Sequence, residues 1–232
     1  MDSAAELALA LVLSADPDLI EIVWLSLRVS LSAVVLSCLI GMPLGALLAT
    51  TSFPGRGGVL VLVNALMGLP PVVVGLMVYL ALSRSGPMGF LGLLYTPSAM
   101  IIAQTILIAP IVTALSRQVL EDMYGEYHAL FRSVGLRKGQ IILALIWDAR
   151  LALMTVALAG FGRATAEVGA VMIVGGNIDH LTRVMTTAIA LETSRGNLAL
   201  AMALGLILML LALVVNALAH GLRLSTARFS NG

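Results

Sequence analysis

Apolar residues dominate five long segments of the chain, and short polar stretches separate these segments. The segments cover residues 22–50, 58–83, 98–115, 141–174 and 197–222. A helix that crosses a bilayer needs about 20 mostly apolar residues, so each segment is long enough to be a membrane span. The stretches between them, such as TSFPGRGG and SRSGPMGFLG, contain residues that end helices. The pattern predicts an all-α, polytopic membrane helical bundle of about five transmembrane helices.

The composition supports this class. The chain is 60% hydrophobic and 11% charged, whereas soluble globular domains are about half apolar and one quarter charged. A soluble fold is therefore excluded. The net charge of +1 comes with no basic stripe that could grip phosphates, so nucleic acid is not expected as a partner. Cys38 is the only cysteine, which excludes a disulfide or a paired-cysteine metal site within the chain.

The chain shows no tandem repeat and no low-complexity linker. We therefore predict one transmembrane domain over residues 1–232, with a membrane core at 22–222 and a cytoplasmic segment at 122–138. The apolar run at 7–13 follows acidic residues, where a signal peptide would carry basic ones. We interpret this run as a short interfacial or packing helix, with a cleaved signal or a sixth span as alternatives.

The basic residues predict how the chain crosses the membrane, because Lys and Arg stay on the cytoplasmic side. If the N-terminus lies outside and the C-terminus inside, only Arg84, Arg183 and Arg195 lie outside. The basic residues then inside are Arg56, Arg117, Arg132, Arg137, Lys138, Arg223 and Arg228. We predict this orientation in the inner membrane.

A polar stretch, DMYGEYHALFRSVGLRKGQ at residues 122–140, interrupts the apolar pattern. Its apolar residues recur at helical spacing, and Gly135 supplies a stop in a left-handed conformation. A short amphipathic helix is predicted. Such a helix can lie on the membrane surface or dock into a groove on a soluble partner, and the periodicity leaves both open. The apolar face consists of Met123, Tyr127, Leu130, Phe131 and Val134.

Residues 128–170, HALFRSVGLRKGQIILALIWDARLALMTVALAGFGRATAEVGA, resemble the signature of binding-protein-dependent ABC importer permeases. In that family a cytoplasmic element, Glu-Ala-Ala followed by three residues and Gly, is the coupling helix. Residues 132–135, Arg-Ser-Val-Gly, match its second half. Residues 129–131, Ala-Leu-Phe, stand where Glu-Ala-Ala is usual, and Trp147 and Asp148 stand where Leu-Pro is usual. The resemblance implies that this segment contacts an ATPase. The candidate contacts are the residues of the apolar face together with Arg132, Ser133 and Gly135.

Three further segments extend the resemblance to residues 22–216. LPPVVVGLMVYLALSRSGPMG at 69–89 and PSAMIIAQTILIAPIV at 97–112 are similar to the second and third spans of molybdate- and tungstate-type permeases. Residues 160–205 look especially like tungstate permeases. The resemblance implies the type I ABC importer permease fold and the inward movement of an oxyanion, with tungstate as the first candidate, by alternating access. Molybdate and sulfate stay open, because all three are tetrahedral dianions.

The resemblance also implies partners: a second copy of the chain in a homodimer, two cytoplasmic ABC ATPases carrying ATP and Mg²⁺, an external oxyanion-binding protein, and membrane lipid. The chain itself lacks a Gly-rich loop ending in Gly-Lys-Ser/Thr, because its only lysine, Lys138, follows Arg137. No cofactor is expected on this chain. No catalytic residue is expected either, although an intramembrane enzyme without a motif remains an alternative. His128, His180 and His220 are far apart in the sequence, and no metal site is expected.

Charged and polar residues within or beside the spans are candidates for the transport pathway, because ionisable groups inside a bilayer normally face protein or an aqueous cavity. Arg163 and Glu167, four residues apart, share a helix face, and we favour an internal ion pair over direct substrate contact. Each other candidate has a local alternative, namely capping for the threonines, helix termination for the asparagine and a kink for the prolines. The full set is Pro70, Pro71, Arg163, Glu167, Asn177, Thr182, Thr186 and Thr187.

Small residues mark places where helices can approach closely. We expect this of the helix that carries Gly162, Ala166, Gly169 and Ala170, and, more weakly, of GMPLG at 41–45. Two rivals from other classes remain. An ion-gradient transporter predicts acids on several spans and inverted repeats, whereas Glu167 is the only clear acid deep in a span. A structural membrane adaptor would leave the Arg163 and Glu167 pair without a transport role.

Overall fold

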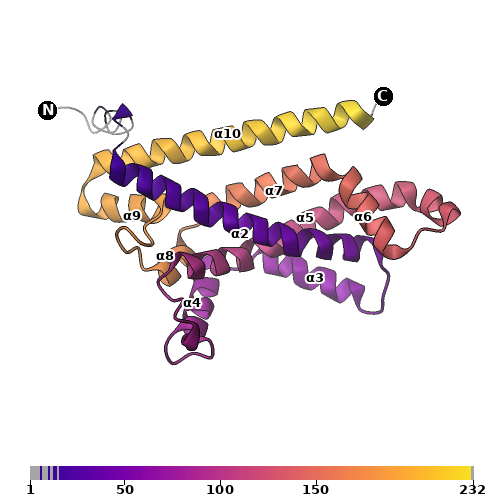
Figure 1. Ribbon diagram of the computed structural model, residues 1–232, viewed down its shortest axis with the longest axis horizontal. Coiled ribbons are helices and arrows are strands. Elements are labelled where there is room, and N and C mark those ends of the chain that lie inside the picture. The colour runs from indigo at the N-terminus through magenta and orange to yellow at the C-terminus, as the bar shows by residue number, and fades with distance from the viewer. Residues whose placement is uncertain (1–5, 7–9, 11–12, 15, 231–232) are drawn as a thin grey trace. The chain divides into compact units, whose positions relative to one another are not determined.

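The computed structural model describes residues 6, 10, 13, 14 and 16–230, with side chains as far as Gly221. The regular elements of this part are helical (Figure 1). They are α2 (Pro17–Thr50), α3 (Arg56–Met67), α4 (Pro71–Leu82), η1 (Gly89–Leu91), α5 (Pro97–Val134), α6 (Lys138–Asp148), α7 (Arg150–Thr165), α8 (Gly169–Gly175), α9 (Met185–Arg195) and α10 (Leu198–Ser230). The predicted helix at 7–13 lies mostly outside the described residues.

The all-α prediction is confirmed, and the helices agree with about five spans. Three described helices, α2, α5 and α10, are long and apolar enough to cross a membrane. The number rises to five if α3 with α4, and α6 with α7, each count as one span.

The first long helix starts five residues before the predicted span. The Asp16 carboxylate accepts the backbone N–H groups of Asp18 (3.0 Å) and Leu19 (3.3 Å). Pro17 occupies the first helical position, where its missing N–H is not needed. The Asp16 cap and Pro17 form a helix start that does not depend on hydropathy, so the apolar pattern by itself placed the boundary too late.

The second predicted span, 58–83, is two helices rather than one. Pro70 takes an extended conformation before α4, and Pro71 is the first residue of that helix. A proline has no N–H for the helical ladder and pushes the residue before it out of helical geometry. Two consecutive prolines therefore end one helix and begin the next.

The fourth predicted span, 141–174, is also interrupted. α6 and α7 meet at Ala149 with a bend of 73°, and α7 ends at Thr165 before α8 begins. No proline or glycine lies at the bend. Instead, the Arg150 side chain donates to the backbone carbonyl of Trp147 at 2.8 Å. A side chain that inserts into the helical ladder in this way is a recognised cause of a kink.

The predicted short helix at the polar stretch is wrong as a separate element. α5 continues without interruption from Pro97 to Val134, so residues 122–134 form the last turns of a 38-residue helix, and the stretch ends in the first turn of α6. Gly125 in this region costs about 1 kcal/mol relative to alanine, which is too little to end a helix rich in good helix formers. The left-handed stop predicted at Gly135 is confirmed, with φ of 69°.

The described chain divides into two compact units built from interleaved segments. Unit 1 holds the described residues up to Ala33 together with Pro70–Gln104 and Gly162–Val214. Unit 2 holds Val34–Leu69, Thr105–Phe161 and the described residues from Val215. The single transmembrane domain stays a prediction.

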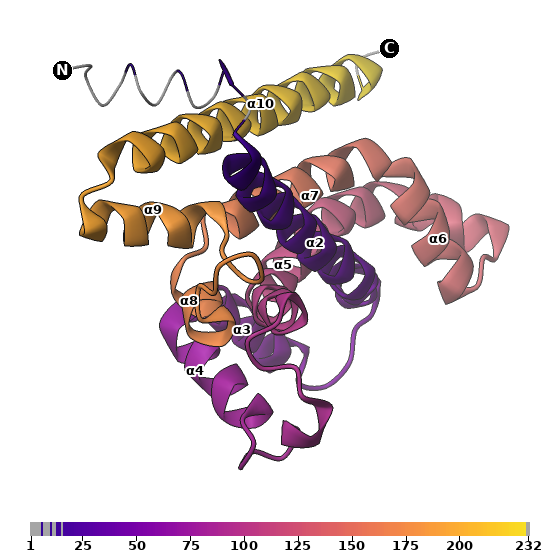
Figure 2. The ribbon, with the colours of Figure 1, turned by 60° about the vertical axis from the view of Figure 1, so that its left-hand side comes forward.

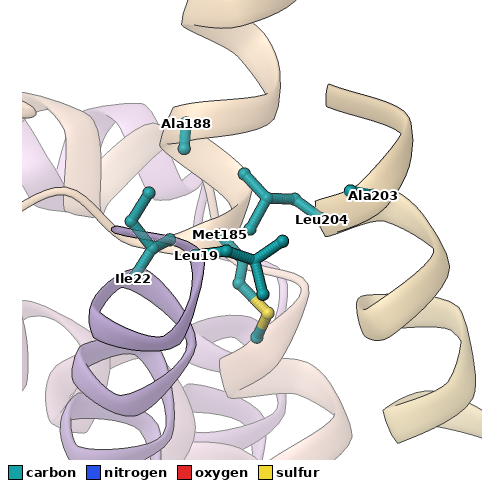
Figure 3. Packing of buried hydrophobic residues seen from close by; sticks show 6 residues of the cluster. All are labelled: Leu19, Ile22, Met185, Ala188, Ala203 and Leu204. Carbon is teal, nitrogen blue, oxygen red and sulfur yellow. The ribbon is translucent and has the colours of Figure 1, made fainter. Parts of the chain in front are cut away.

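The core of unit 1 joins the start of α2 to α9 and α10, as Figure 3 shows. The Met185 side chain lies among the aliphatic side chains of the other two helices. Its backbone N–H donates to the Ser26 hydroxyl at 2.7 Å, which ties α9 to α2. The buried members are Leu19, Ile22, Met185, Ala188, Ala203 and Leu204.

Unit 2 contains a close contact between α2 and α5 at the two glycines of GMPLG. A Cβ atom added at Gly41 would lie 2.9 Å from Val112 Cγ1, and one at Gly45 would lie 2.8 Å from the Thr113 carbonyl oxygen. Real Cβ contacts are longer, so only glycine permits this approach. The predicted close packing at this pair is confirmed.

Candidate functional site

An ion pair links the end of α7 to the start of α8. Arg163 Nη1 donates to Glu167 Oε2 at 2.7 Å, and the other oxygen, Oε1, accepts the backbone N–H of Ala170 at 3.1 Å. The Glu167 side chain is 4% exposed and the Arg163 side chain 35% exposed. Glu167 therefore pairs with a cation and also satisfies a donor at a helix N-terminus. This is the internal ion pair that we favoured from the sequence; substrate contact stays a prediction.

A small polar cavity adjoins this carboxylate within unit 1. Its volume is about 10 Å³, which is space for about one water molecule. Gln104 on α5 is 4% exposed; its Nε2 donates to the Ala164 carbonyl at 3.1 Å, while its Oε1 is buried without a partner among the described residues. The lining consists of Ser26, Val29, Ser30, Gln104, Ala164, Thr165, Glu167, Val184, Met185 and Thr186.

The chemistry of this cavity suits a small hydrogen-bond donor rather than an anion. Glu167 is one of the lining residues, and its negative charge would repel an oxyanion. The volume is also too small for a tetrahedral oxyanion. In this conformation the cavity is therefore not an anion site.

The hydroxyl groups of the three candidate threonines all donate to backbone carbonyls. The Thr186 hydroxyl donates to the Glu167 carbonyl at 2.8 Å, which holds α9 to the connection between α7 and α8. The Thr182 hydroxyl donates to the Gly175 carbonyl at 2.6 Å, and the Thr187 hydroxyl donates to the Val184 carbonyl at 3.0 Å. Thr182 and Thr187 are fully buried. The Thr187 bond, at the start of α9, matches the capping alternative, whereas the Thr186 bond joins residues 19 positions apart. A role of the three threonines in the pathway stays a prediction.

Asn177 lies in the loop after α8 in a left-handed conformation, with φ of 50°. Asparagine tolerates this conformation better than most residues. Its Nδ2 donates to the Thr187 carbonyl at 3.4 Å, and its Oδ1 is buried without a partner among the described residues. The helix itself ends at Gly175, and Gly176 takes the left-handed cap position with φ of 72°, so Asn177 lies one residue beyond the cap. Contact of Asn177 with substrate stays a prediction.

The proline pair begins α4, which packs against α8 in unit 1 (Figure 2). A Cβ atom added at Gly75 would lie 2.8 Å from the Ala170 Cα, and one at Gly169 would lie 2.9 Å from Val72 Cγ2. The expected close approach is therefore confirmed for Gly169 and Ala170 but not for Gly162, around which nothing lies within 4 Å. A gating role for Pro70 and Pro71 stays a prediction.

The C-terminal turns of α5 carry the candidate ATPase contacts. The helix closes with the Leu136 N–H donating to the Phe131 carbonyl at 3.2 Å, around the left-handed Gly135. Arg132 and Ser133 are exposed, and the Ser133 hydroxyl donates to the Leu130 carbonyl at 2.8 Å. The end of α5 thus exposes polar groups and closes at a left-handed cap.

The predicted apolar face of this segment is divided between two environments. Met123, Tyr127 and Phe131 pack against the unit 2 core around Leu145, so the fold already uses them. Leu130 and Val134 are 56% and 64% exposed. Only these last two remain available as anchors for a partner.

A groove lies beside the exposed anchors, between the end of α5 and α6. It has a volume of about 260 Å³ and is lined by Tyr127, Leu130, Phe131, Ala144, Leu145 and Asp148. An apolar side chain of a docking protein would fit such a groove. The segment therefore offers a shaped surface rather than a bare helix face.

The sequence analysis missed Gln104, whose signal was a lone amide within the apolar run IIAQTILIAP. It also missed the contact between His180 and Glu21, where Nδ1 and Oε2 are 2.9 Å apart. No sequence signal could have found this contact, because 159 residues separate its two members.

One candidate metal cluster occurs among the described residues. Ligand atoms of Asp18, Glu21 and His180 lie within 4.8 Å of one another, and all three residues are exposed. Within the cluster, His180 Nδ1 and Glu21 Oε2 form a hydrogen bond of 2.9 Å. The hydrogen bond and charge of Glu21, followed by the charges of Asp179 and Asp18, raise the pKa of His180 above its ordinary 6.5. We interpret the cluster as an ion-pair network.

Comparison with known proteins gives a family and several relatives. Residues 41–225 match the model of the family described as "binding-protein-dependent transport system inner membrane component". The chain is 39% identical to the tungstate uptake system permease protein TupB of Peptoclostridium acidaminophilum, covering 93% of this chain and 95% of that protein. It is 40% identical to TupB of Campylobacter jejuni, with coverages of 93% and 90%. A probable anion ABC transporter permease protein of Haloferax volcanii is 42% identical, with coverages of 86% and 88%.

Proposed function

Because this chain belongs to the family of binding-protein-dependent transport system inner membrane components, we propose that it is the permease subunit of an ABC importer that takes up tungstate. The observation that carries the proposal is the similarity, along nearly the whole length of both chains, to tungstate uptake permeases from two organisms. Membership of the family makes the chain a multi-pass inner membrane protein that works with ATPase and substrate-binding partners.

In the proposed assembly two copies of the chain form a homodimer over two cytoplasmic ATPases, which bind ATP and Mg²⁺. The N-terminus lies outside and the C-terminus inside, as the basic residues favour. An external binding protein delivers the oxyanion. This orientation places the end of α5 in the cytoplasm, on the side of the ATPases.

The proposed coupling surface is the end of α5 together with the groove beside α6. Leu130 and Val134 act as exposed apolar anchors, and the groove accepts a side chain of the ATPase. Motion of this surface moves α6, which is joined through the bend at Ala149 to α7. α7 runs as one helix to Thr165, two residues before Glu167. The coupling is a physical hypothesis until an effect on transport is measured.

The proposed pathway uses groups that bind an oxyanion weakly, because a transporter must release what it admits. Arg163 is the cation with partial exposure beside the pathway candidates, and its charge is largely balanced by Glu167. The threonines and Asn177 would need a second conformation to expose their polar atoms, since their hydroxyl and amide groups now bond to the backbone. Alternating access supplies such a change.

Molybdate or sulfate is the alternative cargo, because the three dianions make similar hydrogen-bond demands. An ion-gradient transporter is the alternative from another class. One experiment tests both alternatives. The chain is reconstituted with its co-purifying ATPase and binding protein, and ATP hydrolysis by the complex is measured with tungstate, molybdate and sulfate in turn.

Stimulation by tungstate at the lowest concentration is the expected result. Stimulation by molybdate or sulfate at a lower concentration would reassign the cargo and keep the ABC class. Failure of any ATPase to co-purify would contradict the coupling proposal and favour the gradient-driven class.

A further inference from the structure

An apolar groove with one cation at its edge lies within unit 2, between α2 and the helices α6 and α7. Its volume is about 420 Å³, within the range of about 300 to 1,000 Å³ typical of small-molecule sites. Several lining residues are strongly exposed, with Leu39 at 67%, Val35 at 55% and Met154 at 51%. The groove is lined by Val34, Val35, Cys38, Leu39, Met42, Ile146, Arg150, Leu153, Met154 and Ala157.

Arg150 is the only ionisable group of this lining besides the Cys38 thiol. Its guanidinium donates to the Trp147 carbonyl at 2.8 Å and lies 5.2 Å from the centre of the Trp147 ring. Among the described residues no carboxylate lies within 4.0 Å of it. The guanidinium is thus held in a fixed position, exposed and without an anionic partner in that part of the chain.

The groove and the cation together match an amphiphile with a negative head. The exposed aliphatic side chains offer a surface for a hydrocarbon chain, whose burial is favourable in proportion to its area. A guanidinium binds phosphate well because its planar donors match the phosphate oxygens. Trp147, 72% exposed, is the residue type enriched at the headgroup level of membranes.

Charge complementarity favours a lipid over a protein helix as the occupant. A helix packed in the groove would have to bring its own carboxylate to Arg150, because an unpaired buried cation is costly. A phospholipid carries the anion and the apolar chain in one molecule. The bilayer also supplies it at high local concentration.

We propose that this groove is a binding site for an anionic phospholipid. Its acyl chain lies along Val35, Leu39 and Met154, and its phosphate contacts Arg150. The site is distinct from the groove between the end of α5 and α6 and from the Arg163 and Glu167 pair. The proposal does not depend on which oxyanion the protein carries.

The two tryptophans of the chain allow a direct test. Trp24→Phe removes the other one, which is 67% exposed on α2, and leaves Trp147 as the only indole. The full-length variant is reconstituted in phosphatidylcholine vesicles that contain a small fraction of brominated phosphatidylglycerol or, separately, brominated phosphatidylcholine. Quenching of Trp147 fluorescence then reports which lipid lies beside the groove.

We expect phosphatidylglycerol to occupy the site about fivefold more strongly than phosphatidylcholine, the effect of about one basic residue near a membrane. Arg150→Gln should abolish the preference, and Arg137→Gln, which removes an exposed arginine away from the groove, should retain it. Ala157→Phe, which fills the groove, should reduce quenching by the anionic lipid while Arg150 is intact.

Equal quenching by both lipids in the Trp24→Phe protein would overturn the proposal. So would a preference that survives Arg150→Gln. A second copy covering the groove is an alternative occupant, and Cys38 tests it as the single thiol of the chain. Efficient crosslinking of two copies through Cys38 by a short bifunctional thiol reagent would also overturn the lipid assignment.

Discussion

Arg163 and Glu167 form an ion pair in which only one partner is buried. Arg163 Nη1 and Glu167 Oε2 are 2.7 Å apart, and the exposed fractions of the two side chains are 35% and 4%. The carboxylate has already lost its water, whereas the guanidinium still reaches solvent. The two charges are therefore not equivalent, and removing either one should have a different effect.

Arg163→Gln should destabilise the protein more than Glu167→Gln. The first change leaves a buried carboxylate without its cation, which we expect to cost about 2–3 kcal/mol. The second change leaves a half-exposed arginine without its carboxylate, and we expect it to lower the free energy of unfolding by about 1 kcal/mol. The loss is smaller because the glutamine oxygen can still accept the Ala170 N–H. Thermal unfolding in detergent measures both.

The double variant Arg163→Gln/Glu167→Gln is the control for this pair. It should cost less than the sum of the single variants, since no charge is left unpaired. Equal losses for the two single variants would contradict the asymmetry.

Gly135→Val should weaken both the complex with the ATPase and the ATP hydrolysis that transport requires. A Cβ atom at this position meets nothing within 4 Å, but φ is 69°, and this conformation costs an ordinary residue about 1–2 kcal/mol. The loss is thus in the backbone and not in packing. Co-purification of the ATPase and stimulated hydrolysis measure it.

Gly135→Asn separates this cause from a steric clash with the partner. Asparagine tolerates the left-handed conformation and is close in size to valine, so it should lose much less. If both variants fail equally, the partner rather than the cap requires the glycine.

Gly45→Ala should destabilise the protein by about 1–3 kcal/mol, the usual effect of overpacking. The added Cβ atom would lie 2.8 Å from the Thr113 carbonyl oxygen and 2.9 Å from the Arg117 nitrogen. Both are backbone atoms that cannot move without shifting α5. Gly125→Ala, at a helical glycine with nothing within 4 Å, should instead stabilise it by up to about 1 kcal/mol. The unfolding temperature of each variant is compared with that of the wild type. A higher unfolding temperature for Gly45→Ala would refute the close packing.

The contact between His180 and Glu21 should make stability depend on pH. The groups that face His180 are Glu21, Asp179 and Asp18, and together they raise its pKa above 6.5. A raised pKa means that protonated histidine stabilises the fold. The contribution is fully present below pH 6.5, the ordinary pKa, and is lost as the pH rises through the folded pKa.

The comparison of wild type with His180→Gln isolates this effect. The difference in unfolding temperature should favour the wild type below pH 6.5 and shrink toward zero as the pH rises through the raised pKa of His180. Glu21→Gln, which removes the main cause of the shift, should show the same loss of pH dependence. A difference that grows with pH would have the wrong sign.

The coupling segment shows where sequence reasoning reached its limit. The spacing of Met123, Tyr127, Leu130, Phe131 and Val134 correctly indicated a helix with one apolar face. It could not show that three of them pack against the core of unit 2 while Leu130 and Val134 stay exposed. The spacing of apolar residues describes one helix by itself. Whether each of them is buried depends on which other helix packs against it.

The sequence by itself determined the helical class, the membrane character, the left-handed stop at Gly135 and the i,i+4 relation of Arg163 with Glu167. These features follow from composition, from local backbone preference and from spacing within one helix. The tertiary structure alone decided the cavity at Gln104 and the contact of His180 with Glu21. It also decided which apolar side chains pack against protein and which stay exposed in the groove beside Arg150. Each of these depends on atoms brought together from different turns or helices, and no pattern along a single segment encodes that meeting.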